Sequence, residues 1–331
     1  MLATPHPFAR FVRLLGRGKT LSRGLTRDEA EEAMAMILAG RVLPEQIGAF
    51  LMLLRMKEET GEEIAGFIAA ARATLPRPTG KVDLDWPSYA GKKRQLPWHL
   101  FAALTLAGAG WRVAVHGLDG HTEGRLYSGE TLARLGAPPA RDFAEAAGQL
   151  ERGRFAYLSL EAIHPELARM MALKPVLGLR SPINTVVRGL NPFAAATSIQ
   201  AVFHPSYVGI HRDAALRLGG ERAVFFRGDG GENERRPNKP LETYRVVGGQ
   251  ADEAQWPAIG DPRQAPDETM DVERLASVWR GARDDYGEAA VMGTIAIALH
   301  TMGVETEPSA AEARARALWE ERDRERLAPA R

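Results

Sequence analysis

The stretch LTRDEAEEAMAMILAGRVLPEQIGAFLMLLRMKEETGEEIAGFIAAA, residues 25–71, decides the fold. A threonine and a glutamate three residues apart form a capping box at its start, Thr26 with Glu29, and the pattern recurs at Thr60. Pro44 sits where the first turn of a helix tolerates proline. Because apolar residues follow each start at helical spacing, the stretch predicts three consecutive helices and a small helical domain.

After residue 80 the pattern changes to short β-rich runs that alternate with helical ones. We predict strands at 82–86, 111–116, 155–160, 199–203, 223–226 and 244–247. Helical patterns lie between them, and the tail from Val272 onward is helical again. This alternation predicts an α/β domain with a mostly parallel central sheet. We therefore divide the chain into a helical domain, 1–78, and an α/β domain with C-terminal helices, 79–331. In an alternative that stays open, the segment at about 166–190 returns to the helical domain and completes it.

Composition excludes several classes of protein. The 331 residues contain no cysteine, which excludes disulfides, thiolate metal sites and cysteine nucleophiles and fits the cytosol. No run is long and apolar enough to span a bilayer, so we expect a cytoplasmic protein without a membrane partner. The net charge of +1 is the sum of acidic helical stretches and basic loops. The kind of binding partner must therefore be inferred from local patches of charge.

Several motifs resemble the superfamily of anthranilate phosphoribosyltransferase and pyrimidine nucleoside phosphorylase, glycosyltransferase family 3. They run in family order over roughly residues 10 to 305 and include Gln46-Ile47-Gly48-Ala49-Phe50-Leu51, His164-Pro165-Glu166-Leu167 and Leu177-Gly178-Leu179-Arg180. The resemblance implies a homodimer with a nucleoside phosphorylase/phosphoribosyltransferase-like fold. It also implies a cleft between the two domains that binds phosphoribosyl pyrophosphate and magnesium.

The residues that the family uses for its chemistry are largely replaced here. The family's Gly-Thr-Gly-Gly-Asp loop, whose amides hold pyrophosphate, corresponds to Pro87-Ser88-Tyr89-Ala90-Gly91. Its Asn-x-Ser-Thr group is replaced by Gln95-Leu96-Pro97-Trp98, and its two magnesium carboxylates by Glu232-Asn233. We therefore expect a pseudoenzyme with no catalytic residue and no cofactor. A residual family site remains at Gly91, His116, Gly117, Arg180, Asn184 and Glu232.

Cations stand where the family binds phosphates, which points to nucleic acid. The predicted binding residues are Lys92, Lys93, Arg94, Arg180, Arg188, Arg235, Arg236 and Lys239. Tyr89 and Trp98 flank the first group and either stack on bases or belong to the core. The pattern is similar to the divergent YbiB-like branch of the superfamily, which implies binding of DNA or RNA without base specificity. That is the first hypothesis.

Two alternatives stay open beside it. The second hypothesis is an active glycosyl- or phosphoribosyltransferase with an altered substrate, in which Glu232 and Asp229 hold magnesium. The third is a non-catalytic scaffold for protein interactions. His116 and His164 are interpreted as structural, and no histidine has the spacing of a zinc ligand.

Overall fold

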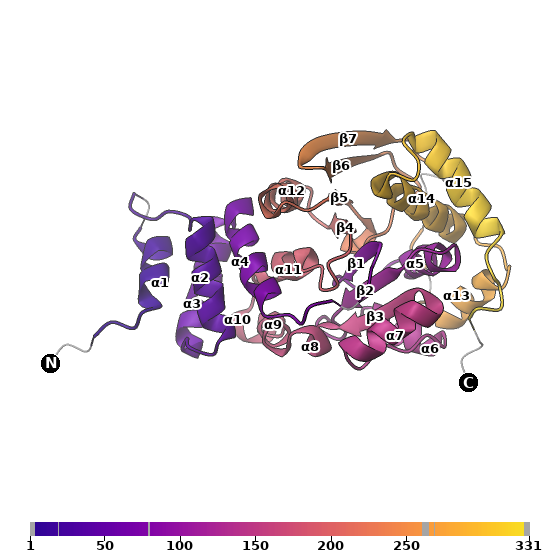
Figure 1. The fold of residues 1–331 in the computed structure, drawn as a ribbon. Helices are drawn as coiled ribbons and strands as arrows, with labels where there is room; N and C mark the ends of the chain where they lie inside the picture. Colours follow the sequence, from indigo (N-terminus) through magenta and orange to yellow (C-terminus); the bar gives the residue numbers. More distant parts are fainter. Residues whose placement is uncertain (1–3, 19, 79, 260–264, 268, 328–331) are drawn as a thin grey trace.

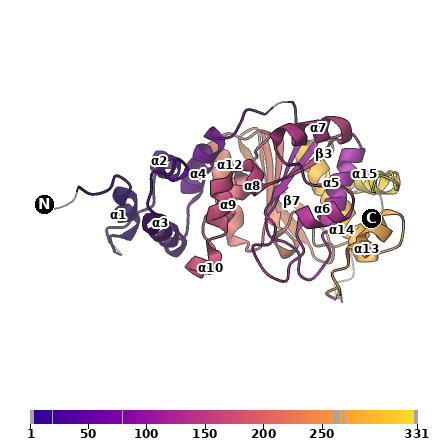
Figure 2. The same cartoon turned by 90° about the horizontal axis from the view of Figure 1, so that it is seen from below.

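Four N-terminal helices form one end of the molecule, and the C-terminal helices lie at the opposite end (Figures 1 and 2). The computed structural model describes residues 4–18, 20–78, 80–259, 265–267 and 269–327. The four helices are α1 (Ala9–Gly16), α2 (Arg27–Leu38), α3 (Pro44–Lys57) and α4 (Gly61–Ala73). Both predicted capping boxes form, because the hydroxyls of Thr26 and Thr60 accept hydrogen bonds from the amides of Glu29 and Glu63. The predicted helices of residues 25–71 are confirmed.

The larger domain contains one seven-stranded sheet in the order β3-β2-β1-β4-β5-β6-β7. Its strands are β1 (Leu84–Ser88), β2 (Val113–Gly117), β3 (Phe155–Ser159), β4 (Thr197–Val202), β5 (Arg222–Arg227), β6 (Leu241–Val247) and β7 (Gln250–Trp256). The first five strands are parallel, and β6 and β7 add an antiparallel hairpin at one edge. The predicted α/β fold is therefore confirmed. Strand β7 was not predicted, because its residues are mostly polar and exposed.

The strand order reverses between β1 and β4. From β1 the chain builds outward through β2 to β3, and then returns to pair β4 with the other side of β1. In open α/β sheets ligands bind beyond the carboxyl ends of the strands at such a switch point. The loops that follow β1, β4 and β5 are therefore the place to look for a site.

Helices cover both faces of the sheet. One face packs against α5 (His99–Gly108), α13 (Val272–Trp279), α14 (Asp285–Met302) and α15 (Pro308–Glu320). The other face carries α7 (Phe143–Gly153), α8 (Leu160–Ile163), α9 (Pro165–Met171), α11 (Ile183–Val186) and α12 (Ser206–Leu218). Short elements complete the chain: α6 (Ser128–Arg134), α10 (Lys174–Leu177), η1 (Val187–Gly189) and η2 (Asp229–Gly231).

The apolar core of the helical end continues into the segment between β3 and β4. Leu167, Met171 and Ile183 share one cluster of buried side chains with Phe50 and Ile64. The domain boundary at residues 78 and 79 stays a prediction, and residue 79 lies outside the described residues. Of the helices in the described part of the chain, none has the length and apolar character to cross a membrane.

Candidate functional site

A small anion cradle follows β1, and the chain's own carboxylate fills it. The amides of Ala90 and Gly91 donate to Oε1 of Glu232 at 2.7 and 2.6 Å, and the Ser88 hydroxyl donates to Oε2 at 2.8 Å. Glu232 is only 1% exposed. Gly91 has a φ of +67°, and a Cβ there would approach the Tyr127 ring to 2.8 Å, so the loop needs glycine. The amides that would hold a phosphate are thus already paired.

The two residues after Glu232 are also committed to the fold. Asn233 ties β1 to β4, because its Nδ2 donates to the carbonyls of Pro87 and Ile199 at 2.8 Å each. Glu234 accepts hydrogen bonds from Lys92 Nζ at 2.6 Å and from the His99 amide at 2.9 Å. Both side chains are buried.

Magnesium, which the resemblance implies for the second hypothesis, does not fit this arrangement. Asp229 is held in an ion pair by Lys92, and both oxygens of Glu232 accept from the β1 loop. Within the described ranges there is no group of three or more histidine and carboxylate side chains that could hold a metal ion. Hard cations need several free oxygen ligands, and here the oxygens already have partners.

Lys92 is buried and does not face solvent. Its ammonium forms ion pairs with Asp229 and Glu234, and the side chain is 1% exposed. Burial alone would lower the pKa of Lys92, but the two carboxylates outweigh it and leave the pKa raised. Lys92 lines the cleft described below, but its ammonium is already paired with two carboxylates, so its binding of a nucleic-acid phosphate stays a prediction.

Arg235 is likewise turned inward. Its guanidinium donates to the Glu312 carboxylate at 2.8 Å and to the Pro257 carbonyl, with no exposed side-chain surface. It also lies over the Trp256 ring, 5.2 Å from the centroid. Since every strong contact is internal, the predicted phosphate-binding role of Arg235 is wrong.

The two predicted stacking residues are core residues. Tyr89 is 1% exposed and its hydroxyl lies 2.7 Å from Nδ1 of His116, whose Nε2 lies 3.1 Å from Asp85. Trp98 has no exposed surface and packs edge-on against Phe101. A base cannot reach either ring, so the stacking prediction is wrong. The contacts of His116 with Tyr89 and Asp85 are those of a buried structural side chain.

Gly117 keeps two neighbouring strand ends close together. It is the last residue of β2, and a Cβ there would lie 2.2 Å from the Ser88 carbonyl oxygen at the end of β1. The family's glycine is therefore retained here for packing beside the cradle.

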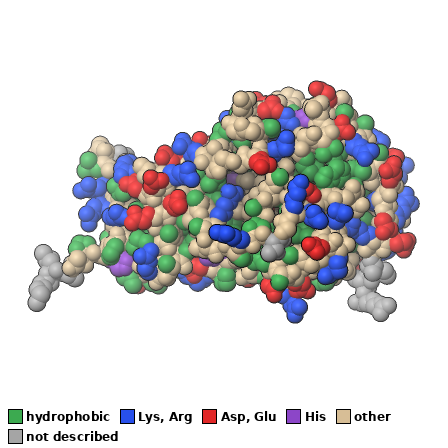
Figure 3. Space-filling model, viewed as in Figure 1, with side chains coloured by type: hydrophobic (Ala, Val, Ile, Leu, Met, Phe, Trp, Pro, Cys, Tyr) green, Lys and Arg blue, Asp and Glu red, His purple; other side chains and the backbone are tan. Residues whose placement is uncertain are grey.

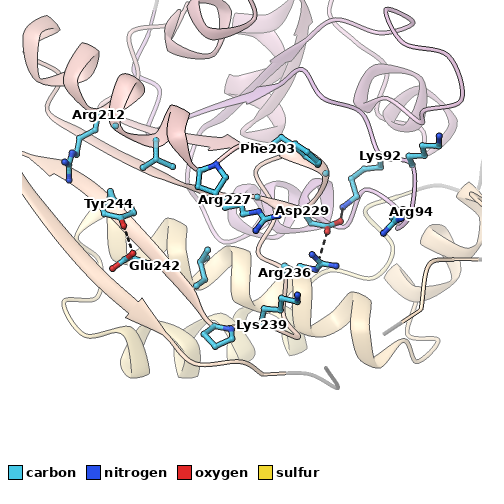
Figure 4. Close-up of a pocket in the computed structure, with 18 of the residues that line it drawn as sticks. Lys92, Arg94, Phe203, Arg212, Arg227, Asp229, Arg236, Lys239, Glu242 and Tyr244 are labelled. Carbon is cyan, nitrogen blue, oxygen red and sulfur yellow. Dashed lines mark hydrogen bonds and ion pairs between the residues drawn. The ribbon is translucent and has the colours of Figure 1, made fainter. Parts of the chain in front are cut away.

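A cationic cleft of about 820 Å³ opens beside the cradle, at the carboxyl ends of β1, β4 and β5 (Figure 4). Its walls come from the loops after these strands and from the start of β6. Besides the ion-paired Lys92, basic side chains dominate the lining: Lys93, Arg94, Arg125, Arg212, Arg227, Arg236 and Lys239. Figure 3 shows Lys and Arg side chains gathered along the middle of one face of the molecule.

Most of these cations have no acidic partner. Arg212 lies 3.3 Å from Glu253, and Arg236 lies 3.9 Å from Asp229. The other five form no ion pair with any residue that the structure describes: Lys93, Arg94, Arg125, Arg227 and Lys239. Burial alone would raise the pKa of Asp229, but the cations around it leave that pKa lowered. The cleft is therefore strongly positive.

Three residues of the predicted site do not line the cleft: Arg180, Asn184 and Arg188. Burial lowers the pKa of Arg180, and the nearby charge of Arg125 lowers it further. Arg188 donates to the Asn184 carbonyl at 2.6 Å, and burial lowers its pKa too. Arg125, which lines the cleft, donates to the Ala90 and Gly91 carbonyls and lies near enough to Arg180 to lower its pKa. The binding role of Arg180 and Arg188 stays a prediction.

Five predicted cations line the cleft when the ion-paired Lys92 is counted, and three further cations of the cleft were not predicted. We expect the predicted cations to share one surface, and four of them line the cleft with side chains that are not buried: Lys93, Arg94, Arg236 and Lys239. Arg227 is the last residue of β5, Arg212 lies on the helix after β4, and Arg125 lies in the loop after β2. Position at the carboxyl end of a parallel strand would have indicated Arg227, whereas Arg125 and Arg212 lie eight and ten residues beyond their strands and carry no such signal.

Comparison with known proteins agrees with this fold. The helical bundle domain of the glycosyl transferase family matches residues 11–75. Anthranilate phosphoribosyltransferase of Rubrobacter xylanophilus is 30% identical over 261 residues, which cover 77% of this chain and 75% of that protein. YbiB of Escherichia coli is 29% identical over 238 residues, or 70% of this chain and 74% of YbiB.

Solved structures match over almost the whole chain. Anthranilate phosphoribosyltransferase from Thermus thermophilus superposes with a TM-score of 0.75 at 22% identity, covering 95% of this chain and 94% of that one. The Saccharomyces cerevisiae enzyme, in complex with PRPP and Mg, gives a TM-score of 0.74 at 15% identity, covering 95% and 93%. These likenesses establish the fold, and the sequence identity to the relatives establishes the family. The chain belongs to the anthranilate phosphoribosyltransferase superfamily.

Proposed function

We propose that this protein binds nucleic acid, DNA or RNA, through its phosphates and without base specificity. The observation that carries the proposal is the cationic cleft, in which five basic side chains lack an acidic partner within the described chain. Long cationic side chains bind a phosphate backbone without reading sequence. Glu232 adds support, because it closes the amide cradle that a single pyrophosphate would use.

Alanine variants of the cleft test the proposal. The pair Lys93→Ala with Arg94→Ala, and the pair Arg236→Ala with Lys239→Ala, should each weaken binding of a labelled mixed-sequence oligonucleotide in fluorescence anisotropy. For duplex DNA, each lost phosphate contact should reduce the slope of log affinity against log salt by about 0.9. Wild-type affinity in both pairs would contradict the proposal.

A matched control separates position from net charge. Arg141→Ala with Arg283→Ala removes two positive charges whose side chains are 86% and 84% exposed and which do not line the cleft. This variant should bind the oligonucleotide as the wild type does. An equal loss in the control would mean that total charge, and not the cleft, governs the affinity.

The family relationship favours a second candidate, an active glycosyl- or phosphoribosyltransferase with an altered substrate. Its support is the identity to anthranilate phosphoribosyltransferases and the retention of Arg180 and Asn184. Such an activity requires Glu232 to leave the cradle. Thermal melting with phosphoribosyl pyrophosphate, with and without magnesium and then with anthranilate, distinguishes the candidates. A higher melting temperature supports the transferase, and an unchanged one counts against it.

A further inference from the structure

We propose that the cleft takes single-stranded nucleic acid and that Phe203 is the ring on which a base stacks. This inference rests on the proposed nucleic-acid binding and goes beyond it, because phosphate contacts alone do not distinguish a single strand from a duplex. It replaces the sequence-based prediction for Tyr89 and Trp98, whose rings are buried.

Phe203 is the one exposed Phe, Tyr or Trp side chain in the part of the chain that the structure describes, at 50% exposure. It directly follows β4 and lines the cationic cleft. Single exposed apolar side chains are common on protein surfaces, so what distinguishes Phe203 is not its exposure but its place on the wall of a cleft lined by cations.

The ring is held in place at its base. The loop of η2 passes close beneath it, since a Cβ on Gly231 would lie 3.1 Å from the Phe203 Cβ. The His204 ring meets it edge-on at 4.9 Å between centroids. Figure 4 shows Phe203 on the wall of the cleft near Arg227 and Asp229.

The other aromatic side chains of the cleft region do not offer a free face. The guanidinium of Arg212 lies over the Tyr244 ring, 5.4 Å from its centroid, and the Tyr244 hydroxyl donates to Glu242. Tyr207 is partly buried and hydrogen-bonded to Arg55. Phe203 is therefore the side chain that combines exposure with a place among the cations.

Stacking on a ring inside a cleft selects for unpaired bases. Bases in a duplex are already stacked and paired, so their faces are not available to a side chain. The cleft volume of about 820 Å³ is also that of a small-ligand pocket, which suits a base with its flanking phosphates and not the full width of a duplex. Proteins that bind single strands commonly pair a basic groove with aromatic platforms.

The test compares three ligands of equal phosphate number: a labelled deoxythymidine oligonucleotide, its abasic counterpart and a duplex. Phe203→Ala should weaken binding of the deoxythymidine strand about tenfold and leave binding of the other two ligands unchanged. Phe203→Trp should restore the lost affinity. The salt dependence should not change, because no cation is removed.

Two outcomes overturn the inference, and they differ from failure of the proposed function. Equal affinity of Phe203→Ala and wild type for the deoxythymidine strand would exclude stacking, while nucleic-acid binding itself stands. An equal loss for all three ligands would show that Phe203 shapes the cleft and does not stack. If the wild type binds none of the three at low salt, the proposed function fails too. Thermal melting of each variant confirms that an exposed side chain was changed without unfolding.

Discussion

Replacing Lys92 with methionine should destabilise the protein rather than act first on ligand binding. The side chain is 1% exposed and its ammonium is paired with Asp229 and Glu234. Methionine keeps most of the stem and removes the charge. Two carboxylates then lack their counter-ion in a buried environment, and removal of one partner from a buried pair costs about 3–5 kcal/mol.

Remaining contacts place the expected cost at the lower end of that range. Glu234 keeps its hydrogen bond from the His99 amide, and Asp229 keeps Arg236 at 3.9 Å. With an unfolding entropy of about 2.1 cal/mol/K per residue, a loss of about 3 kcal/mol lowers the melting temperature of this 331-residue chain by roughly 4 °C.

Thermal and urea unfolding, followed by circular dichroism, measure the effect. Lys93→Met is the matched control, because the neighbouring side chain is exposed and unpaired with any described acid, and it should melt as the wild type does. The double variant Lys92→Met with Glu234→Gln should recover part of the loss, since one uncompensated charge is removed. A Lys92→Met protein that melts like the wild type would refute the reasoning.

Three further predictions concern the cradle, pH and assembly. Glu232→Ala should melt at a lower temperature than the wild type and regain stability with added pyrophosphate, because two loop amides lose their acceptor; no response to pyrophosphate would argue against a cradle. Burial lowers the pKa of His211 to about 3 from 6.5, so between those values only the unfolded chain binds the proton and stability falls as pH drops. His211→Gln should therefore lose about 2 kcal/mol less than the wild type between pH 7 and 5 in urea titrations, and equal losses would contradict the assignment. We also propose the homodimer that the family resemblance implies. Met56 and Val176 are 78% and 79% exposed, so changing both to glutamate should yield monomers in sedimentation if they lie in the interface, and an unchanged mass would exclude them from it.

Local signals made the fold predictable. Capping boxes and apolar spacing depend on residues a few positions apart, so α2 to α4 follow from the sequence. Strands β1 to β6 carry β-rich runs and were predicted near their observed positions. Strand β7 depends on pairing with β6 more than on its own residues, so its sequence does not carry the apolar pattern that predicts a strand.

The candidate site was predictable only in part. Lys93 and Arg94 line the cleft as expected, while the adjacent Lys92 turns inward toward Asp229 and Glu234. These acids lie more than a hundred residues away in the chain, and no local pattern indicates their contact. The same holds for Glu232. Its carboxylate reaches the amides of the β1 loop only in the folded sheet, where β4 pairs with both β1 and β5.

The salt dependence of oligonucleotide binding by the wild-type protein tests the central claim most directly. If the unpaired cations of the cleft hold phosphates, log affinity falls linearly with log salt, with similar values for unrelated sequences. Absence of binding at low salt, or an affinity that does not respond to salt, would contradict the account.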